Sequence, residues 1–167
     1  MRAFVKCRDR AHMNCLFRVF LFSWLIAAVI SAQAAVEVPS AWLGTWQLNV
    51  AKSTSVGTLP YRRGTRTIAA ADDGRVTIVD DLVRIRGGIL HLEWTGKFDG
   101  VDYPVQGVEV VLTSAYRRVD DRTWELKQKI DGEPVATVRF TISPDGKTLT
   151  SVTSTRTDSA TTVYDKR

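Results

Sequence analysis

The chain has 167 residues, is 44% hydrophobic and carries a formal net charge of +5 at pH 7. Five lysines and arginines against one acidic residue precede residue 35, so residues 35–167 have a net charge of only +1. This near balance leaves no electrostatic surplus for binding a phosphate backbone, and we expect no nucleic-acid partner.

The first 34 residues have the parts of a secretory signal peptide. A basic stretch precedes the apolar run Val19–Ile30, and the small-residue triplet Ala32-Gln33-Ala34 follows it. This is the order of an n-region, a helical h-region and an A-x-A cleavage site. The apolar run is shorter than the ~20 residues that span a bilayer. We therefore expect a periplasmic or secreted protein with no membrane anchor after cleavage. Met13 is favoured over Met1 as the translation start, because residues 13–34 have ordinary signal-peptide proportions.

Residues 35–167 lack most of the residue types on which catalytic and metal sites depend. Both cysteines, Cys7 and Cys15, lie in the leader, and His91 is the only histidine that follows it. Disulfides and thiolate sites are thereby excluded, and zinc sites usually need several His or Cys ligands. Neither a G-x-S-x-G elbow nor a G-x-x-x-x-G-K or G-x-G-x-x-G motif occurs. We expect no enzyme, no cofactor and no metal.

Short β-rich segments separated by turn residues predict an antiparallel sheet. Dipeptides that favour hairpin turns recur along the chain: Asp73-Gly74, Gly87-Gly88, Asp99-Gly100, Asp120-Asp121, Asp131-Gly132 and Pro144-Asp145-Gly146. Between them apolar residues occupy every second position, as a strand with one buried face requires. The predicted strands are Trp42–Val50, Gly64–Ala71, Arg75–Val79, Leu82–Arg86, Ile89–Phe98, Gly107–Val119, Thr123–Ile130, Pro134–Ile142, Thr148–Thr157 and Thr161–Lys166.

These strands predict one all-β domain over residues 35–167, either a sandwich or an up-and-down barrel of about eight to ten strands. The irregular stretch Ala51–Arg63 would cross one open end of a barrel. The adjacent acids Asp80-Asp81 are interpreted as hydrophilic residues at a turn, and the alternative, a pair of catalytic carboxylates, is weaker.

Three motifs and the chain's end carry a family resemblance. GTWQLNVAKS (44–53), KFDGVDYPVQG (97–107) and SPDGKTLT (143–150) resemble small exported bacterial lipocalin-like proteins, and Val163-Tyr164-Asp165-Lys166 is similar to the last strand of fatty-acid-binding proteins. The resemblance implies a calycin-type, lipocalin-like antiparallel β-barrel. It also implies that Trp46 is a structural plug at one end of the barrel, under an arginine from a late strand, for which Arg156 is the candidate. Thr162 stands where fatty-acid-binding proteins have a carboxylate-binding arginine.

The leading functional hypothesis is a monomeric, non-catalytic barrel that holds a small apolar or amphipathic ligand. Tyr116 and Tyr164 would offer hydroxyl groups to such a ligand, and Arg139 or Arg156 a charge if their strand faces turn inward. The predicted lining residues are Trp94, Phe98, Tyr116, Trp124, Arg139, Phe140, Arg156 and Tyr164. The alternative is an envelope or protein-interaction module with a filled core, which the turn-rich segment Asp99–Pro104 favours.

We predict cleavage after Ala34, because the triplet and the short h-region satisfy the export pattern. N-terminal sequencing of the exported protein should give Ala35-Val36-Glu37. A mature form that still contains Leu21–Ile30 would contradict the prediction.

Overall fold

The computed structural model describes residues 38–56 and 60–167, so the predicted leader lies outside the described residues. Within these ranges the chain forms two short 3-10 helices, η1 (Val50–Lys52) and η2 (Asp72–Gly74), and eleven β-strands. The strands are β1 (Gly44–Leu48), β2 (Thr54–Ser55), β3 (Tyr61–Ala70), β4 (Val76–Arg84), β5 (Ile89–Gly96), β6 (Tyr103–Gln106), β7 (Leu112–Asp120), β8 (Thr123–Ile130), β9 (Glu133–Ile142), β10 (Thr148–Ser154) and β11 (Ser159–Lys166). No helix in these ranges is long and apolar enough to cross a membrane.

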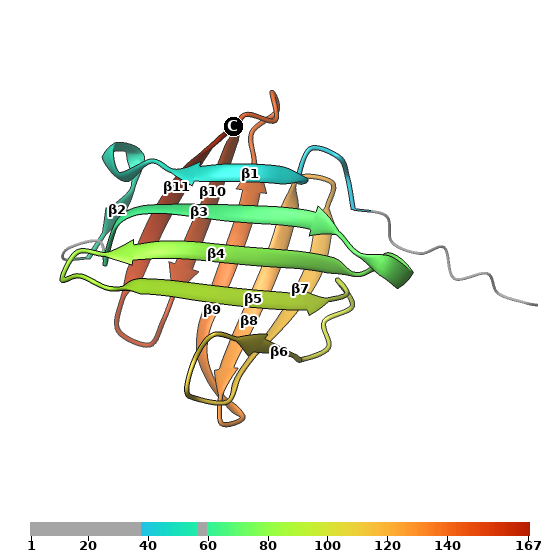
Figure 1. Cartoon of the computed structure of the whole chain (residues 1–167). Helices are drawn as coiled ribbons and strands as arrows, with labels where there is room; N and C mark the ends of the chain where they lie inside the picture. The colour runs from blue at the N-terminus through green and yellow to red at the C-terminus, as the bar shows by residue number, and fades with distance from the viewer. Residues whose placement is uncertain (1–37, 57–59) are drawn as a thin grey trace, which may run out of the picture. The chain divides into compact units, whose positions relative to one another are not determined.

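The strands close into an antiparallel barrel. From β3 to β11 each strand pairs with its neighbour in sequence, and β1 pairs with both β3 and β11, which joins the two edges of the sheet. The two-residue β2 adds to the outer edge of β11. In Figure 1, β3, β4 and β5 run across the page in front of β8, β9 and β10, which run from top to bottom. The predicted all-β, lipocalin-like barrel is therefore confirmed.

Alternation along the strands fills the interior. In β4, Val76, Ile78, Asp80 and Leu82 are buried, while Thr77, Val79 and Asp81 between them are more exposed. The same pattern in β9 buries Val138, Phe140 and Ile142. Side chains that alternate across a strand place every second residue on the inner face, so these strands line one continuous core.

Tryptophans close one end of the barrel. Trp46 is fully buried, and its indole Nε1 donates to the carbonyl of Trp42 at 2.9 Å. Trp42, also fully buried, stacks on Trp124 with ring centroids 3.6 Å apart. The ammonium of Lys166 lies 4.9 Å from the Trp46 ring and donates to the carbonyl of Ala41 at 2.7 Å. The cation over Trp46 is thus Lys166 of β11, and the expectation of Arg156 was wrong because that residue follows β10 and is exposed.

Two strand predictions also need correction. The predicted strands on either side of Asp80-Asp81 form one continuous strand, β4, and the carboxylate of Asp80 is buried within it. A short strand, β6, begins within the turn-rich segment Asp99–Pro104, for which no strand was predicted. There Tyr103 packs edge-on against Trp94, with centroids 6.0 Å apart, and donates to Asp99 at 2.9 Å.

We predict that Trp46→Ala lowers the free energy of unfolding by about 3–5 kcal/mol, because removing this large buried ring leaves a cavity in the core. Urea denaturation followed by circular dichroism measures this change. A loss below about 1 kcal/mol would show that Trp46 is peripheral to the core.

Candidate binding site in the barrel interior

A buried ion pair lies inside the barrel, between β3 and β4. Arg66 and Asp80 are register partners on these strands. The guanidinium of Arg66 donates twice to the carboxylate, from Nε to Oδ1 at 2.7 Å and from Nη2 to Oδ2 at 2.8 Å. The two side chains are only 11% and 12% exposed. A paired, doubly hydrogen-bonded geometry is the one in which burial of two charges is tolerated.

Aromatic side chains from the opposite strands surround the pair. The guanidinium carbon of Arg66 lies 4.6 Å from the centroid of Phe140 on β9 and 5.7 Å from that of Tyr164 on β11. Arg66 therefore reaches across the interior, and cation–π attraction adds to its hydrogen bonds. Tyr116 on β7 is buried beside Phe140, with ring centroids 6.1 Å apart.

The ionisable groups of this cluster are held in fixed charge states. Burial raises the pKa of Tyr164 to about 12, and it also raises the pKa of Tyr116. In both cases the nearby charge of Arg66 opposes the shift. Burial alone would lower the pKa of Arg66, but the adjacent carboxylate of Asp80 raises it. Near neutral pH the interior thus presents two neutral phenols and one internally neutralised ion pair.

Arg66 and Asp80 were not among the lining residues predicted from the sequence. Alternation within β4 contained the information, because Asp80 stands at an inward position between Ile78 and Leu82. Its neighbour Asp81 is exposed and accepts a 2.7 Å hydrogen bond from His91 Nδ1 on the outside. Two adjacent acids on opposite faces of one strand were mistaken for two acids at a turn.

The structure brings together six of the eight predicted lining residues. Trp94, Tyr116, Trp124, Phe140 and Tyr164 are buried, and Phe98 packs against them half-buried. Ring contacts join them: the centroids of Trp94 and Tyr116 are 4.4 Å apart, and those of Phe98 and Trp124 are 4.0 Å apart. Their roles in ligand binding stay a prediction.

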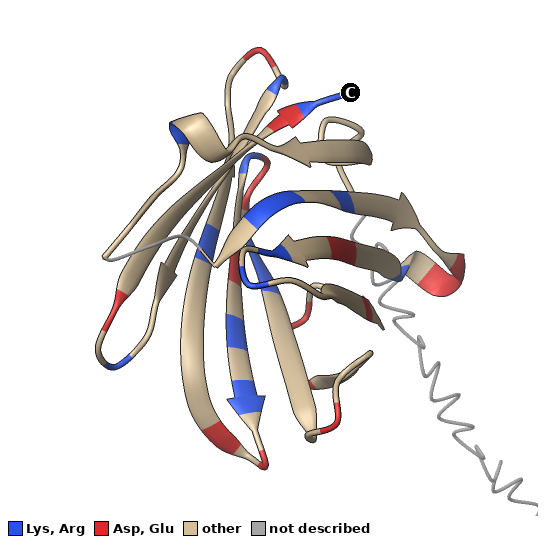
Figure 2. Cartoon of the chain, turned by 60° about the vertical axis from the view of Figure 1, so that its left-hand side comes forward, with Lys and Arg blue, Asp and Glu red and all other residues tan. Residues whose placement is uncertain are grey.

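The two predicted arginines do not face the interior. Arg139 lies on the exposed face of β9 and pairs with Glu125 at 2.6 Å. Glu125 also pairs with Arg117 at 2.6 Å, so the three strands β7, β8 and β9 share one charged cluster on the outside. In Figure 2 basic and acidic bands lie side by side on these strands. The inward orientation considered for Arg139 was wrong because the alternation places its neighbours Val138 and Phe140 inside.

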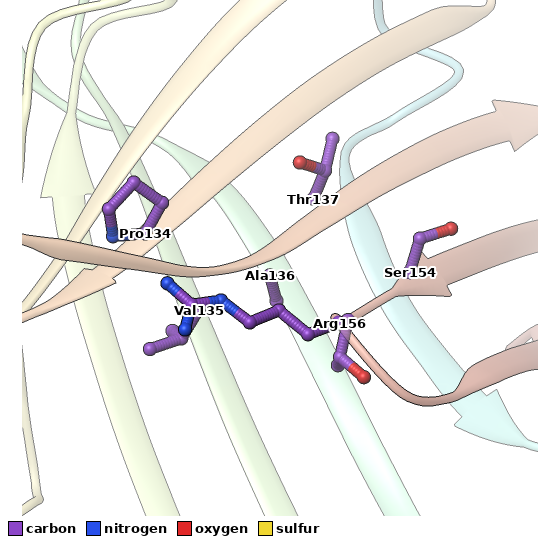
Figure 3. A pocket seen from close by; sticks show the side chains of 7 residues that line it. Pro134, Val135, Ala136, Thr137, Ser154 and Arg156 are labelled. Atoms are coloured by element: carbon purple, nitrogen blue, oxygen red, sulfur yellow. The ribbon is translucent and has the colours of Figure 1, made fainter.

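Arg156 lines an open groove at the end of the barrel opposite Trp46. The groove has a volume of about 320 Å³ and lies where β9 begins and β10 ends, as Figure 3 shows. An adjoining hollow of about 400 Å³ adds Glu133 and Thr157 to the same walls. The lining residues of the first groove are Pro134, Val135, Ala136, Thr137, Ser154, Thr155 and Arg156.

One buried donor in the described part of the chain has no acceptor. Trp124 Nε1 is shielded from solvent and makes no hydrogen bond. By contrast, Trp94 Nε1 donates to the carbonyl of Ser114 at 3.1 Å and Trp42 Nε1 to that of Asp121 at 2.9 Å. A buried donor without an acceptor costs free energy, and a single water molecule would satisfy this indole.

The described ranges hold no group of three or more His, Cys, Asp or Glu side chains arranged for a metal ion. The histidine at position 91, with its Asp81 partner, lies on the exposed face of β5, and both side chains are more than half exposed.

Comparison with known proteins identifies the fold. No protein-family model and no curated protein sequence matches the chain. Solved structures do match: fatty-acid-binding protein 1 of Echinococcus granulosus (14% identity, 76% of this chain and 98% of that chain, TM-score 0.56) and a Schistosoma mansoni fatty-acid-binding protein in complex with arachidonic acid (14%, 78% and 98%, 0.56). The extracellular fatty-acid-binding protein As-p18 is similar at 14% identity, covering 78% of this chain and 99% of that one, with a TM-score of 0.58. The chain has the calycin-type fold of these proteins, as its motifs predicted.

We predict that Asp80→Ala destabilises the barrel by about 3–5 kcal/mol, because it leaves the buried guanidinium of Arg66 uncompensated. The double variant Arg66→Met/Asp80→Leu should recover most of this loss by replacing both charges with apolar groups. Asp81→Ala is the matched control: the same residue type, one position away and exposed, should cost less than about 1 kcal/mol. Urea denaturation measures all three, and equal losses for Asp80→Ala and Asp81→Ala would refute a structural role for the pair.

Proposed function

We propose that the protein is an exported, non-catalytic barrel that binds a small apolar or amphipathic molecule whose polar group is uncharged. The observation that supports this most is the polar cluster inside a largely apolar barrel: Arg66, Asp80, Tyr116 and Tyr164. Polar groups in such an interior need partners, and a ligand hydroxyl, carbonyl or amide supplies donors and acceptors without adding a charge.

The internal neutralisation of Arg66 supports an uncharged ligand. Asp80 already occupies the guanidinium with two hydrogen bonds, so a ligand carboxylate would have to displace it or enter beside it. Bringing a second carboxylate next to Asp80 is unfavourable because like charges repel and burial penalises each of them. Thr162, in place of an arginine on β11, offers no compensating charge.

Two further features support a ligand. Fatty-acid-binding proteins, whose fold this chain shares, are named for the ligands they hold, and one of the similar structures contains arachidonic acid. The groove beside Arg156, at the end opposite the tryptophans, is the proposed route into the barrel.

The alternative, an interaction module with a filled core, is supported by the packing at the closed end. There the ring of Trp124 contacts both Trp42 and Phe98, with centroids 3.6 and 4.0 Å away. Aromatic rings packed in this way leave no room for a ligand at that end, so a binding site has to lie nearer the ion pair.

We predict that a long-chain alcohol and an apolar fluorescent probe each change the tryptophan emission saturably, and that the fatty acid of the same chain length binds no more tightly than the alcohol. Tyr164→Phe should weaken alcohol binding about fivefold, the typical effect of one hydrogen bond, and leave the apolar probe unaffected. Arg117→Gln, an exposed change on β7, is the control and should alter neither.

Tight binding of the acid that disappears with the alcohol would contradict an uncharged ligand. Failure of every apolar probe to bind saturably would favour the interaction module.

A further inference from the structure

Four arginines gather at one corner of the barrel, at the end opposite Trp46. The start of β3 supplies two of them, and the end of β4 with the β4–β5 turn supplies the others. These segments are adjacent, since Tyr61 is the register partner of Arg84 and the amide of Ile85 donates to the carbonyl of Pro60 at 3.0 Å. Figure 2 shows the two basic segments next to each other. We name this feature the arginine tip: Arg62, Arg63, Arg84, Ile85, Arg86 and Ile89.

The charges of the arginine tip are not neutralised within the described part of the chain. The arginines that form ion pairs there are Arg66, Arg117, Arg118 and Arg139. No Asp or Glu occurs between residues 54 and 64 or between residues 82 and 92. All four tip arginines are exposed, so the tip is a concentrated positive patch on a domain whose overall charge is near balance.

The arginine tip also exposes large apolar side chains. Ile89 is 73% exposed and Ile85 is 46% exposed, which are high values for isoleucine in a folded domain. The turn between them, Gly87-Gly88, stands clear: a Cβ added to either glycine would meet no described atom within 4 Å. Two isoleucines therefore flank a free turn and are ringed by unpaired guanidinium groups.

We propose that the arginine tip docks on an anionic lipid bilayer. Guanidinium groups suit lipid phosphates, which they bind bidentately, and branched apolar side chains between them suit the boundary between head groups and acyl chains. An acidic protein surface would satisfy the arginines alone and would leave Ile85 and Ile89 without a role. This inference is independent of any interior ligand.

The test is sedimentation of the purified protein with vesicles of phosphatidylcholine alone and of phosphatidylcholine with phosphatidylglycerol in equal parts. We expect binding to the mixed vesicles that weakens as salt rises. Comparing variants of the same chain cancels any contribution from its N-terminal residues. Arg84→Gln/Arg86→Gln should weaken binding about 25-fold, at about fivefold for each arginine near a charged surface. Arg117→Gln/Arg139→Gln removes the same charge from the outer face of β7 and β9 and should have little effect.

A second pair of variants tests the apolar part. Ile85→Thr/Ile89→Thr should weaken vesicle binding about tenfold, because two partly inserted apolar side chains are lost. Val101→Thr/Val119→Thr, at exposed positions near the other end of the barrel, is the control. Circular dichroism verifies that each variant is folded.

Three results would overturn the proposal. These are equal binding to both kinds of vesicle, equal losses for tip and control variants, and loss with the arginine changes but not with the isoleucine changes. The last result, together with tight binding of polyaspartate, would indicate an acidic protein partner instead. Titration with an apolar probe in the absence of vesicles tests the proposed ligand separately, so either proposal can fail alone.

Discussion

The Arg66–Asp80 ion pair is the constraint around which the interior of this barrel is organised. Two charges taken out of water are costly, and their attraction repays that cost only when geometry and additional contacts are good. Here the carboxylate accepts two hydrogen bonds at 2.7 and 2.8 Å, and Phe140 lies 4.6 Å from the guanidinium carbon. The pair joins β3 and β4 directly and contacts β9 and β11 through aromatic rings. A change in any of these strands therefore affects the charges at the centre.

Closure of the sheet makes this arrangement durable. Because β1 pairs with both β3 and β11, the sheet closes on itself at that seam, while β6 joins β5 and β7 through only two residue pairs each. The fully buried rings of Trp42 and Trp46 seal one end, and Lys166 covers Trp46 from above while bonding to the carbonyl of Ala41. An apolar, closed surrounding strengthens the electrostatic interactions inside it, so the closure and the ion pair support each other.

The amino-acid pattern predicted the barrel and most of its inward aromatic residues, since alternation reports burial on each strand independently. It did not predict partners across the interior. Asp80 and Asp81 are identical neighbours in sequence, yet one is buried against Arg66 and the other is exposed beside His91. Likewise Lys166, and not Arg156, covers Trp46. Such pairings depend on which strands face each other across the closed barrel. Local residue patterns contain no information about which residues lie opposite one another there.

The two ends of the barrel differ: buried tryptophans close one end, and a groove and exposed side chains lie at the other. At one end the indole donors of Trp42 and Trp46 are bonded to carbonyl oxygens, both rings are fully buried, and Trp42 stacks on Trp124. At the other end lie the groove beside Arg156 and the exposed isoleucines of the arginine tip. The ion pair lies between them, half-way along β3 and β4. A molecule that approached from the groove would meet the polar cluster before the aromatic plug. For the ligand proposed above, this order favours a molecule that ends in its polar group over one that carries that group in its middle.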